Sequence, residues 1–187
     1  MPPPPAARAK LLDAFIQILI EQGERAATLE AVAAAAGVSK GGLLYHFASK
    51  DALVAGLAEH LEGLGAADVE AMRTAPEGPA AYYVRTSNYE DTVLDRAIVA
   101  TICLSQGANT RAQDALLRIR DCWMDAMAEE IPDRAIAQTV MLIGDGLYYN
   151  AAMSGTPSIV TDDEMNELLT IVRRIIGDAR AGAEGRS

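Results

Sequence analysis

A pair of very short helical segments separated by a glycine constrains this chain more than any other feature. Thr28 is a good helix N-cap residue, and alanine-rich sequence follows it as far as Ala36. Gly37 suits the left-handed backbone of a tight turn, and Ser39 then starts a second segment that ends near Phe47. Two such helices form a helix-turn-helix, whose second helix enters the major groove of DNA.

The residue types within this stretch meet the demands of that motif. Small Ala33 lets the two helices approach, and apolar residues hold their crossing angle; these are Val32, Val38, Leu43 and Phe47. Two glycines in the second segment cost a helix about 1 kcal/mol each relative to alanine. A purely structural αα-corner gains nothing from that cost, whereas a backbone that must approach DNA does. The pattern therefore favours DNA binding over a simple packing corner.

Helical periodicity continues through the rest of the chain, without an internal repeat or useful β-alternation. The predicted fold is all-α, with helices over about 6–22, 29–36, 40–47, 50–70, 80–89, 91–107, 110–131, 133–154 and 162–180. Two helix starts match the capping-box pattern, Thr110 with Gln113 and Thr161 with Glu164. A proline- and glycine-containing segment, 74–79, interrupts the pattern and is the best internal boundary.

Charge at first argues against a nucleic-acid partner, because the chain of 187 residues has a net charge of -10. The excess of acidic residues, however, lies in the last two-thirds of the sequence. All three lysines lie in the first third: Lys10, Lys40 and Lys50. The net charge of the whole chain therefore does not describe the segment that would meet DNA.

The segment from Ala36 to Leu53 resembles the DNA-binding domain of the tetracycline-repressor-like (TetR) family of bacterial regulators, and the similarity extends over about residues 8–55. It rests on Gly-Val-Ser at 37–39 followed by an aromatic residue, Phe47 and Ser49-Lys50. The resemblance implies an N-terminal three-helix helix-turn-helix domain followed by a larger helical ligand-binding and dimerisation domain. The expected limits are a disordered tail at 1–7, the DNA-binding domain at 8–48, a connector helix plus the second domain at 49–180, and a disordered tail at 181–187.

The same resemblance assigns DNA contacts position by position. The candidates are Thr28, Ser39, Lys40, Gly41, Gly42, Leu44, Tyr45, His46 and Lys50. Thr28, Tyr45, His46 and Lys50 are expected near phosphates, and the Lys40–Gly42 segment near base edges or the adjacent backbone. Leu44 departs from the family, which usually has tyrosine there, so it would touch a thymine methyl group or simply pack.

In the second domain, aromatic and methionine side chains indicate either plain core or an adaptable pocket for an apolar or aromatic effector. The candidate ligand residues are Trp123, Met127, Met141 and Tyr148. The last two helices carry apolar residues over much of their circumference, which predicts a homodimer interface. Its candidate residues are Val140, Gly144, Leu147, Leu168, Val172 and Ile175.

Other chemistries have little support in the sequence. Cys103 and Cys122 are expected as reduced thiols, and no cofactor or metal site is predicted. His46 and His60 are the only histidines, so no nucleophile, base and acid converge as an enzyme requires. No signal or membrane-spanning segment is predicted, and the expected location is the cytosol. The prediction is a ligand-responsive DNA-binding regulator that represses from a pseudo-palindromic operator; the alternative is a helical protein-interaction module without specific DNA binding.

Overall fold

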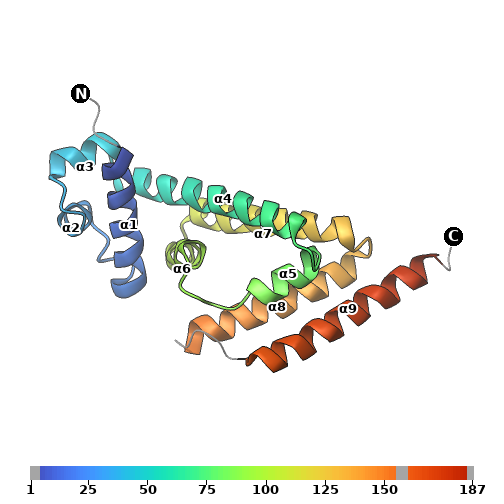
Figure 1. Cartoon of the computed structure of the whole chain (residues 1–187). Helices are drawn as coiled ribbons and strands as arrows, with labels where there is room; N and C mark the ends of the chain where they lie inside the picture. Colours follow the sequence, from blue (N-terminus) through green and yellow to red (C-terminus); the bar gives the residue numbers. More distant parts are fainter. Residues whose placement is uncertain (1–4, 155–159, 185–187) are drawn as a thin grey trace. The chain divides into compact units, whose positions relative to one another are not determined.

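The computed structural model describes residues 5–154 and 160–184, and these residues form helices without any strand (Figure 1). The all-α prediction is therefore confirmed. The helices are α1 (Pro5–Gln22), α2 (Leu29–Ala35), α3 (Lys40–His46), α4 (Lys50–Thr74), α5 (Pro79–Thr86), α6 (Val93–Gln106), α7 (Thr110–Glu130), α8 (Arg134–Ser154) and α9 (Asp162–Glu184).

Side-chain caps start the three helices that follow α1. The hydroxyl of Thr28 accepts a hydrogen bond from Ala31 N at 3.2 Å, and that of Ser39 accepts one from Gly42 N at 3.1 Å. Ser49 does the same for α4 through the backbone N–H three residues on, at 3.1 Å. Each cap satisfies a backbone donor that the first helical turn leaves open, as the sequence predicts.

One of the two predicted capping boxes is confirmed and the other is wrong. At α9, Thr161 N donates to the Glu164 carboxylate at 2.7 Å, and the Glu164 N–H donates back to the Thr161 hydroxyl at 3.3 Å. At α7 the cap is instead Asn109, whose Oδ1 accepts from Ala112 N at 3.1 Å. The asparagine one residue earlier competes successfully with Thr110, because its side-chain carbonyl has the same reach.

The predicted tails are shorter than expected where the structure describes them. Helix α1 already begins at Pro5, where proline fits the first helical turn, and α9 continues to Glu184. Residues 1–4 and 185–187 of the predicted tails lie outside the described residues, as do 155–159 with the predicted helix-breaking Gly155 and Pro157.

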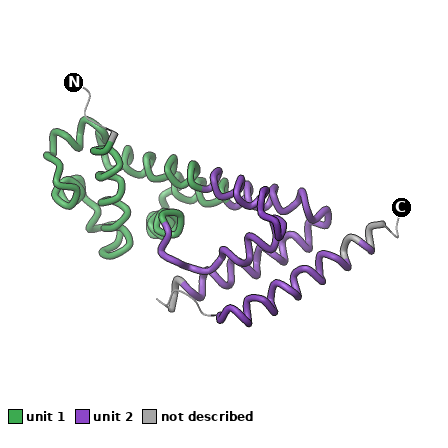
Figure 2. The backbone as a smooth tube through the Cα atoms, in the orientation of Figure 1, with its two compact units in different colours: residues 1–64, 93–119 green, residues 65–92, 120–187 purple. Residues whose placement is uncertain are grey.

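Contacts divide the chain into two compact units (Figure 2). Unit 1 comprises residues 1–64 and 93–119, and unit 2 comprises residues 65–92 and 120–187, so α4 and α7 contribute to both. Unit 1 thus combines the helix-turn-helix segment with α6, which packs closely against α1. A reading by chain order assigns α6 to the second domain, because it cannot show which helix covers the apolar side of α1.

The core of unit 1 is aliphatic with two phenylalanines. Leu11, Phe15 and Leu19 of α1 are completely buried, and Leu53 and Leu57 of α4 are buried as well. This core supports the helix-turn-helix, since both α2 and α3 pack on α1.

Unit 2 packs α5 against α8 and α9. Gly144 permits the close approach of α8 to α5, because a Cβ there would lie 2.4 Å from Cε1 of Tyr83. The Tyr83 hydroxyl donates to Asp145 at 2.8 Å, and burial together with that carboxylate raises the pKa of the Tyr83 phenol. The phenol therefore stays protonated and keeps its hydrogen bond at any physiological pH.

The described ranges, 5–154 and 160–184, hold neither a candidate membrane span nor a candidate metal cluster. None of the helices there combines the length and hydropathy that a bilayer-crossing segment needs. No group of three or more His, Cys, Asp or Glu side chains within the same residues is arranged to hold a metal ion.

The turn between α6 and α7 stores backbone strain at Ala108. Its φ is +63°, in the left-handed region that favours glycine. Ala108→Gly is therefore expected to raise the free energy of unfolding by about 1 kcal/mol, or the melting temperature by about 2–4 °C. Thermal denaturation followed by circular dichroism measures the change. Ala66→Gly, at an exposed position inside α4, is the control and should be destabilising by a similar amount. A decrease at Ala108 as large as that at Ala66 would contradict the strain.

Candidate nucleic-acid interface

The helix-turn-helix is held by a small buried seam. Val32 of α2 and Leu43 of α3 are fully buried, and Phe47 is 2% exposed. Gly37 has a φ of +64° and makes the turn between the helices. Phe47 packs on α4 where a Cβ at Gly56 would lie only 2.7 Å from its Cε1 atom, so that glycine makes room for the ring. The crossing of α2 and α3 is thus determined by buried contacts and leaves the outer side of α3 open.

The outer side of α3 presents the residues predicted to meet DNA. Tyr45 is 68% exposed and Leu44 is 40% exposed, which is unusual for large apolar side chains in a small helix. A Cβ at Gly41 would meet no atom within 4 Å. The backbone at Gly41 is therefore approachable from outside, as a close contact with DNA requires.

Gly42 has a different environment from Gly41. A Cβ there would lie 2.9 Å from Cγ1 of Val38 and 3.3 Å from the Ser39 hydroxyl that caps α3. This glycine therefore serves the turn, whatever further role it has toward DNA.

The capping hydroxyls of Thr28 and Ser39 accept hydrogen bonds from backbone N–H groups. A hydroxyl that accepts still has its own proton to donate. Both residues are exposed, so each could donate that proton to a phosphate while keeping its cap.

Lys40 is engaged within the motif. Its Nζ lies 2.6 Å from Oε1 of Glu30 on α2, and both side chains are more than half exposed. This hydrogen bond is the main reason that the pKa of Glu30 is lowered below its ordinary value. Glu30 was not predicted; its only signal in the sequence was one acidic and one basic residue on facing helices of a corner.

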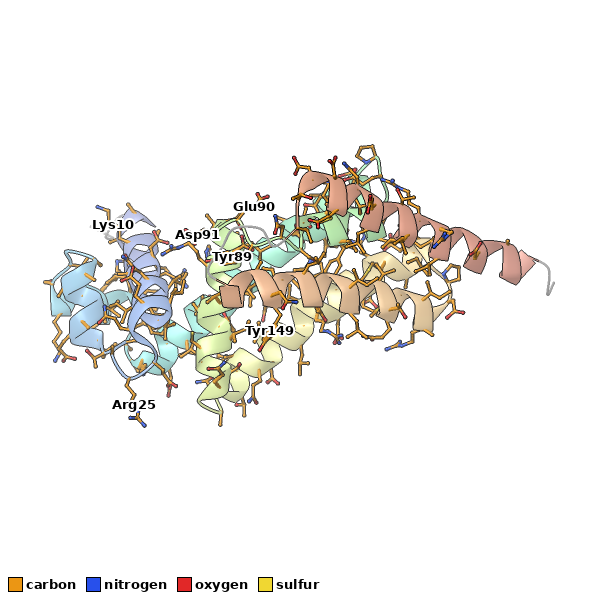
Figure 3. All side chains as sticks on the ribbon, turned by 90° about the horizontal axis from the view of Figure 1, so that it is seen from below. Lys10, Arg25, Tyr89, Glu90, Asp91 and Tyr149 are labelled. Carbon is orange, nitrogen blue, oxygen red and sulfur yellow. The ribbon has the colours of Figure 1, made fainter. Side chains whose placement is uncertain are left out.

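Lys50 is also engaged. Its Nζ donates to the backbone carbonyl of Glu24 at 2.8 Å and lies 3.6 Å from the Glu24 carboxylate. The lysine side chain is 36% exposed, so a phosphate could still reach it. Lys50 thus ties the start of α4 to the loop after α1. Arg25, in the same loop, projects away from the helices (Figure 3).

His46 has one accessible ring nitrogen for a phosphate. Its Nε2 is buried and has no hydrogen-bond partner among the described residues, while its ring meets that of Tyr45 edge-on at 5.3 Å. A proton on Nε2 would be buried without an acceptor, which favours the tautomer protonated on Nδ1. Nδ1–H is then the group that a phosphate would contact.

The predicted ligand residues fall into two places in unit 2. Met127 and Met141 are fully buried in its core cluster, and Trp123 packs against that cluster. Tyr148 instead meets the ring of Tyr89 edge-on at 6.1 Å. A cavity of about 140 Å³ between α1 and α6 in unit 1 is lined by none of these residues and is small for an effector.

A carboxylate with two aromatic donors lies beside this cluster and was not predicted. Asp68 accepts from the Tyr82 hydroxyl at 3.0 Å and from Nε1 of Trp123 at 2.8 Å. Burial and the Asp68 charge raise the pKa of Tyr82 to about 12. The sequence signal, an aspartate in an amphipathic helix, is too common to have identified it.

The structure buries three of the six residues predicted for a dimer interface. Val140 and Val172 are fully buried in the core of unit 2, and Gly144 is covered by Tyr83. Leu147, Leu168 and Ile175 are half-buried, the first two against the same core. Among the side chains that the structure describes in α8 and α9, the exposed large apolar ones are Leu142 (58%), Tyr149 (63%, Figure 3) and Ile171 (43%). The buried apolar residues of α8 and α9 face inward because α5 packs against both helices.

Comparison with known proteins supports the assignment of the motif. The model of "Bacterial regulatory proteins, tetR family" matches residues 11–57, which include every predicted DNA contact. The HTH-type transcriptional regulator BetI of Burkholderia mallei (strain NCTC 10229) is 28% identical over 163 residues, covering 80% of this chain and 84% of that protein. BetI of Burkholderia thailandensis is likewise 28% identical, over 164 residues.

Solved structures show the same fold. A member of the TetR family from Streptomyces coelicolor A3 superposes with a TM-score of 0.67 at 22% identity, covering 90% of this chain and 98% of that one. The multidrug binding protein EbrR complexed with malachite green gives a TM-score of 0.65 at 21% identity, with 90% and 96% covered.

Regulators of the TetR family are non-enzymatic proteins that bind DNA and small-molecule effectors, typically as dimers. Residues 11–57 thus match the model of the tetR family of bacterial regulatory proteins, and the chain shares the fold of solved TetR-family regulators.

Proposed function

We propose that this chain is a repressor that binds a pseudo-palindromic operator as a homodimer and leaves it when a small apolar or aromatic effector binds. The observation that carries the DNA-binding part is the outer side of α3. That side presents the open backbone at Gly41, the exposed side chain of Tyr45 and the hydroxyl of Ser39. The inner side of the same helix is buried in the core through Leu43. Nothing inside the unit requires the two exposed large side chains of α3.

A dimer would place two copies of α3 in successive major grooves, with half-sites about 34–36 Å apart. We propose Leu142, Tyr149 and Ile171 as the pairing surface, because they are large apolar residues that lie exposed on the described part of α8 and α9. The effector would act by binding more tightly to a conformation that does not fit the operator.

The effector is proposed to bind in unit 2, near the cluster of Trp123, Met127 and Met141. Methionine side chains can repack around different apolar shapes. EbrR, which has the same fold, is a multidrug binding protein crystallised with malachite green, an aromatic compound. That likeness supports an aromatic class of effector.

Selection of bound duplexes from a random library tests the DNA-binding part. Repeated rounds should enrich an inverted repeat, and fluorescence anisotropy should give a much higher affinity for that selected duplex than for a scrambled one. Equal weak binding to both, or no binding, would favour a protein-interaction module. Adding malachite green to the complex with the selected duplex then tests effector release; unchanged anisotropy at saturating dye would remove this dye class from the proposal.

Lys50→Ala should weaken binding to the selected and scrambled duplexes by similar factors, roughly tenfold at low salt, as loss of a phosphate contact does. The slope of log affinity against log salt should flatten by about 0.9 per protomer. Because Nζ also holds the Glu24 carbonyl, the melting temperature should fall. Lys50→Arg, which keeps the charge, is the control. A change of preference at a single base pair would show that Lys50 reads sequence instead.

A further inference from the structure

We propose that Glu30 is a specificity-determining residue: by holding Lys40 in an ion pair inside the helix-turn-helix, it suppresses binding to non-cognate DNA. The proposal rests on the DNA-binding function argued above. It concerns the pair described earlier, in which Lys40 Nζ lies 2.6 Å from Glu30 Oε1.

Glu30 and Lys40 carry all the formal charge of α2 and α3 when His46 is counted as neutral. Helix α2 has the sequence LEAVAAA and α3 has KGGLLYH, so Glu30 is their only carboxylate and Lys40 their only Lys or Arg. With His46 neutral, the two helices that would meet DNA therefore carry no net charge. If α2 and α3 served affinity alone, we would expect their one lysine to be unpaired.

Glu30 has no structural need for this partner. Its side chain is 64% exposed and that of Lys40 is 60% exposed, and exposed ion pairs add little to stability. The hydrogen bond nevertheless orients Nζ, and it lowers the pKa of Glu30. A glutamate is charged at neutral pH even at its ordinary pKa, so both partners carry their charges where DNA is bound.

The consequence differs between the two kinds of DNA. Non-specific binding comes from lysine–phosphate contacts that release counterions, and a lysine already paired with a carboxylate contributes less to it. At a cognate site, Nζ can keep Glu30 and still donate to the O6 and N7 acceptors of a guanine, because an ammonium has three N–H groups. Glu30 therefore penalises the scrambled duplex more than the selected one, because it weakens a non-specific lysine–phosphate contact.

Glu30→Gln tests this directly. At about 50 mM salt we expect affinity for the scrambled duplex to rise about tenfold, and its salt slope to steepen by about 0.9 per protomer. Affinity for the selected duplex should rise by less than about threefold, so the ratio of the two affinities falls. Anisotropy titrations over a range of salt measure all three quantities.

Glu62→Gln is the matched control. Glu62 of α4 lies 2.6 Å from Arg118 of α7, in an exposed pair of the same length in the same unit, and the change removes the same charge. It should leave the affinity ratio unchanged. An equal fall of the ratio in both variants would overturn the proposal, because net charge would then explain it.

A double-mutant cycle with Lys40→Gln separates release of the lysine from direct repulsion between Glu30 and phosphate. Glu30→Gln should have almost no effect in the Lys40→Gln background; a full effect there would overturn the proposal. If selection enriches a duplex and Glu30→Gln leaves the ratio unchanged, only this inference fails. If selection enriches no sequence, the proposed function fails and the inference falls with it.

Discussion

Gly41→Glu is expected to abolish operator binding while leaving the fold as stable as before, or more so. The carboxylate would stand at the N-terminus of α3, where a Cβ meets no atom within 4 Å, and would face the phosphates. Juxtaposed like charges cost several kcal/mol, so affinity should fall by about a hundredfold or more. Replacing a helical glycine and placing an acid in the first turn both favour the helix.

Anisotropy with the selected duplex and a thermal melt followed by circular dichroism measure the two effects. Gly41→Gln is the control of equal size without the charge, and should bind more tightly than the Glu variant. The same change at Gly42 is a poorer test, because its Cβ would crowd Val38 and disturb folding as well as binding. A folded Gly41→Glu protein with wild-type affinity would show that the outer side of α3 does not meet DNA.

Val172→Arg is expected to destabilise unit 2 strongly, whereas Ile171→Arg, one residue earlier in α9, should change its stability little. Val172 is fully buried, and an unpaired charge there should cost about 3–5 kcal/mol. The melting temperature should fall by about 10 °C or more. Ile171 is 43% exposed, so the same arginine can reach water, and the melting temperature should change by only about a few degrees.

The substitutions Val172→Arg and Ile171→Arg also test the proposed dimer surface. Ile171→Arg should give a folded monomer in light scattering at micromolar concentration, with operator affinity reduced by well over tenfold, since a monomer reads only one half-site. An Ile171→Arg protein that remains a dimer would show that pairing uses another surface. A Val172→Arg protein that melts like the wild type would show that α9 packs the other way round in solution.

The helices and the position of the helix-turn-helix could be predicted from local sequence patterns. Caps such as Ser39 and the left-handed Gly37 act on the backbone within three or four residues, so their effect can be read from spacing alone. The cap of α7 was predicted one residue too late, at Thr110 instead of Asn109, because two neighbouring residues compete for the same few N–H groups. Spacing alone therefore places a helix start only to within about one residue. The match of residues 11–57 to the family model rests on the same local pattern.

Which residues of those helices are buried and which are paired depends on the packing of the helices against one another. Val172 and Ile171 are adjacent apolar residues of one helix, and contacts with α5 determine which of them faces inward. Lys40 meets Glu30 because the two helices cross at a particular angle. That angle depends on the buried seam between them and on the core of α1 beneath, which are sums of many weak contacts between residues far apart in the sequence. Local sequence patterns do not reveal these long-range contacts. The sequence therefore predicted the DNA-binding helix α3 but not the ion pair between its single lysine and Glu30.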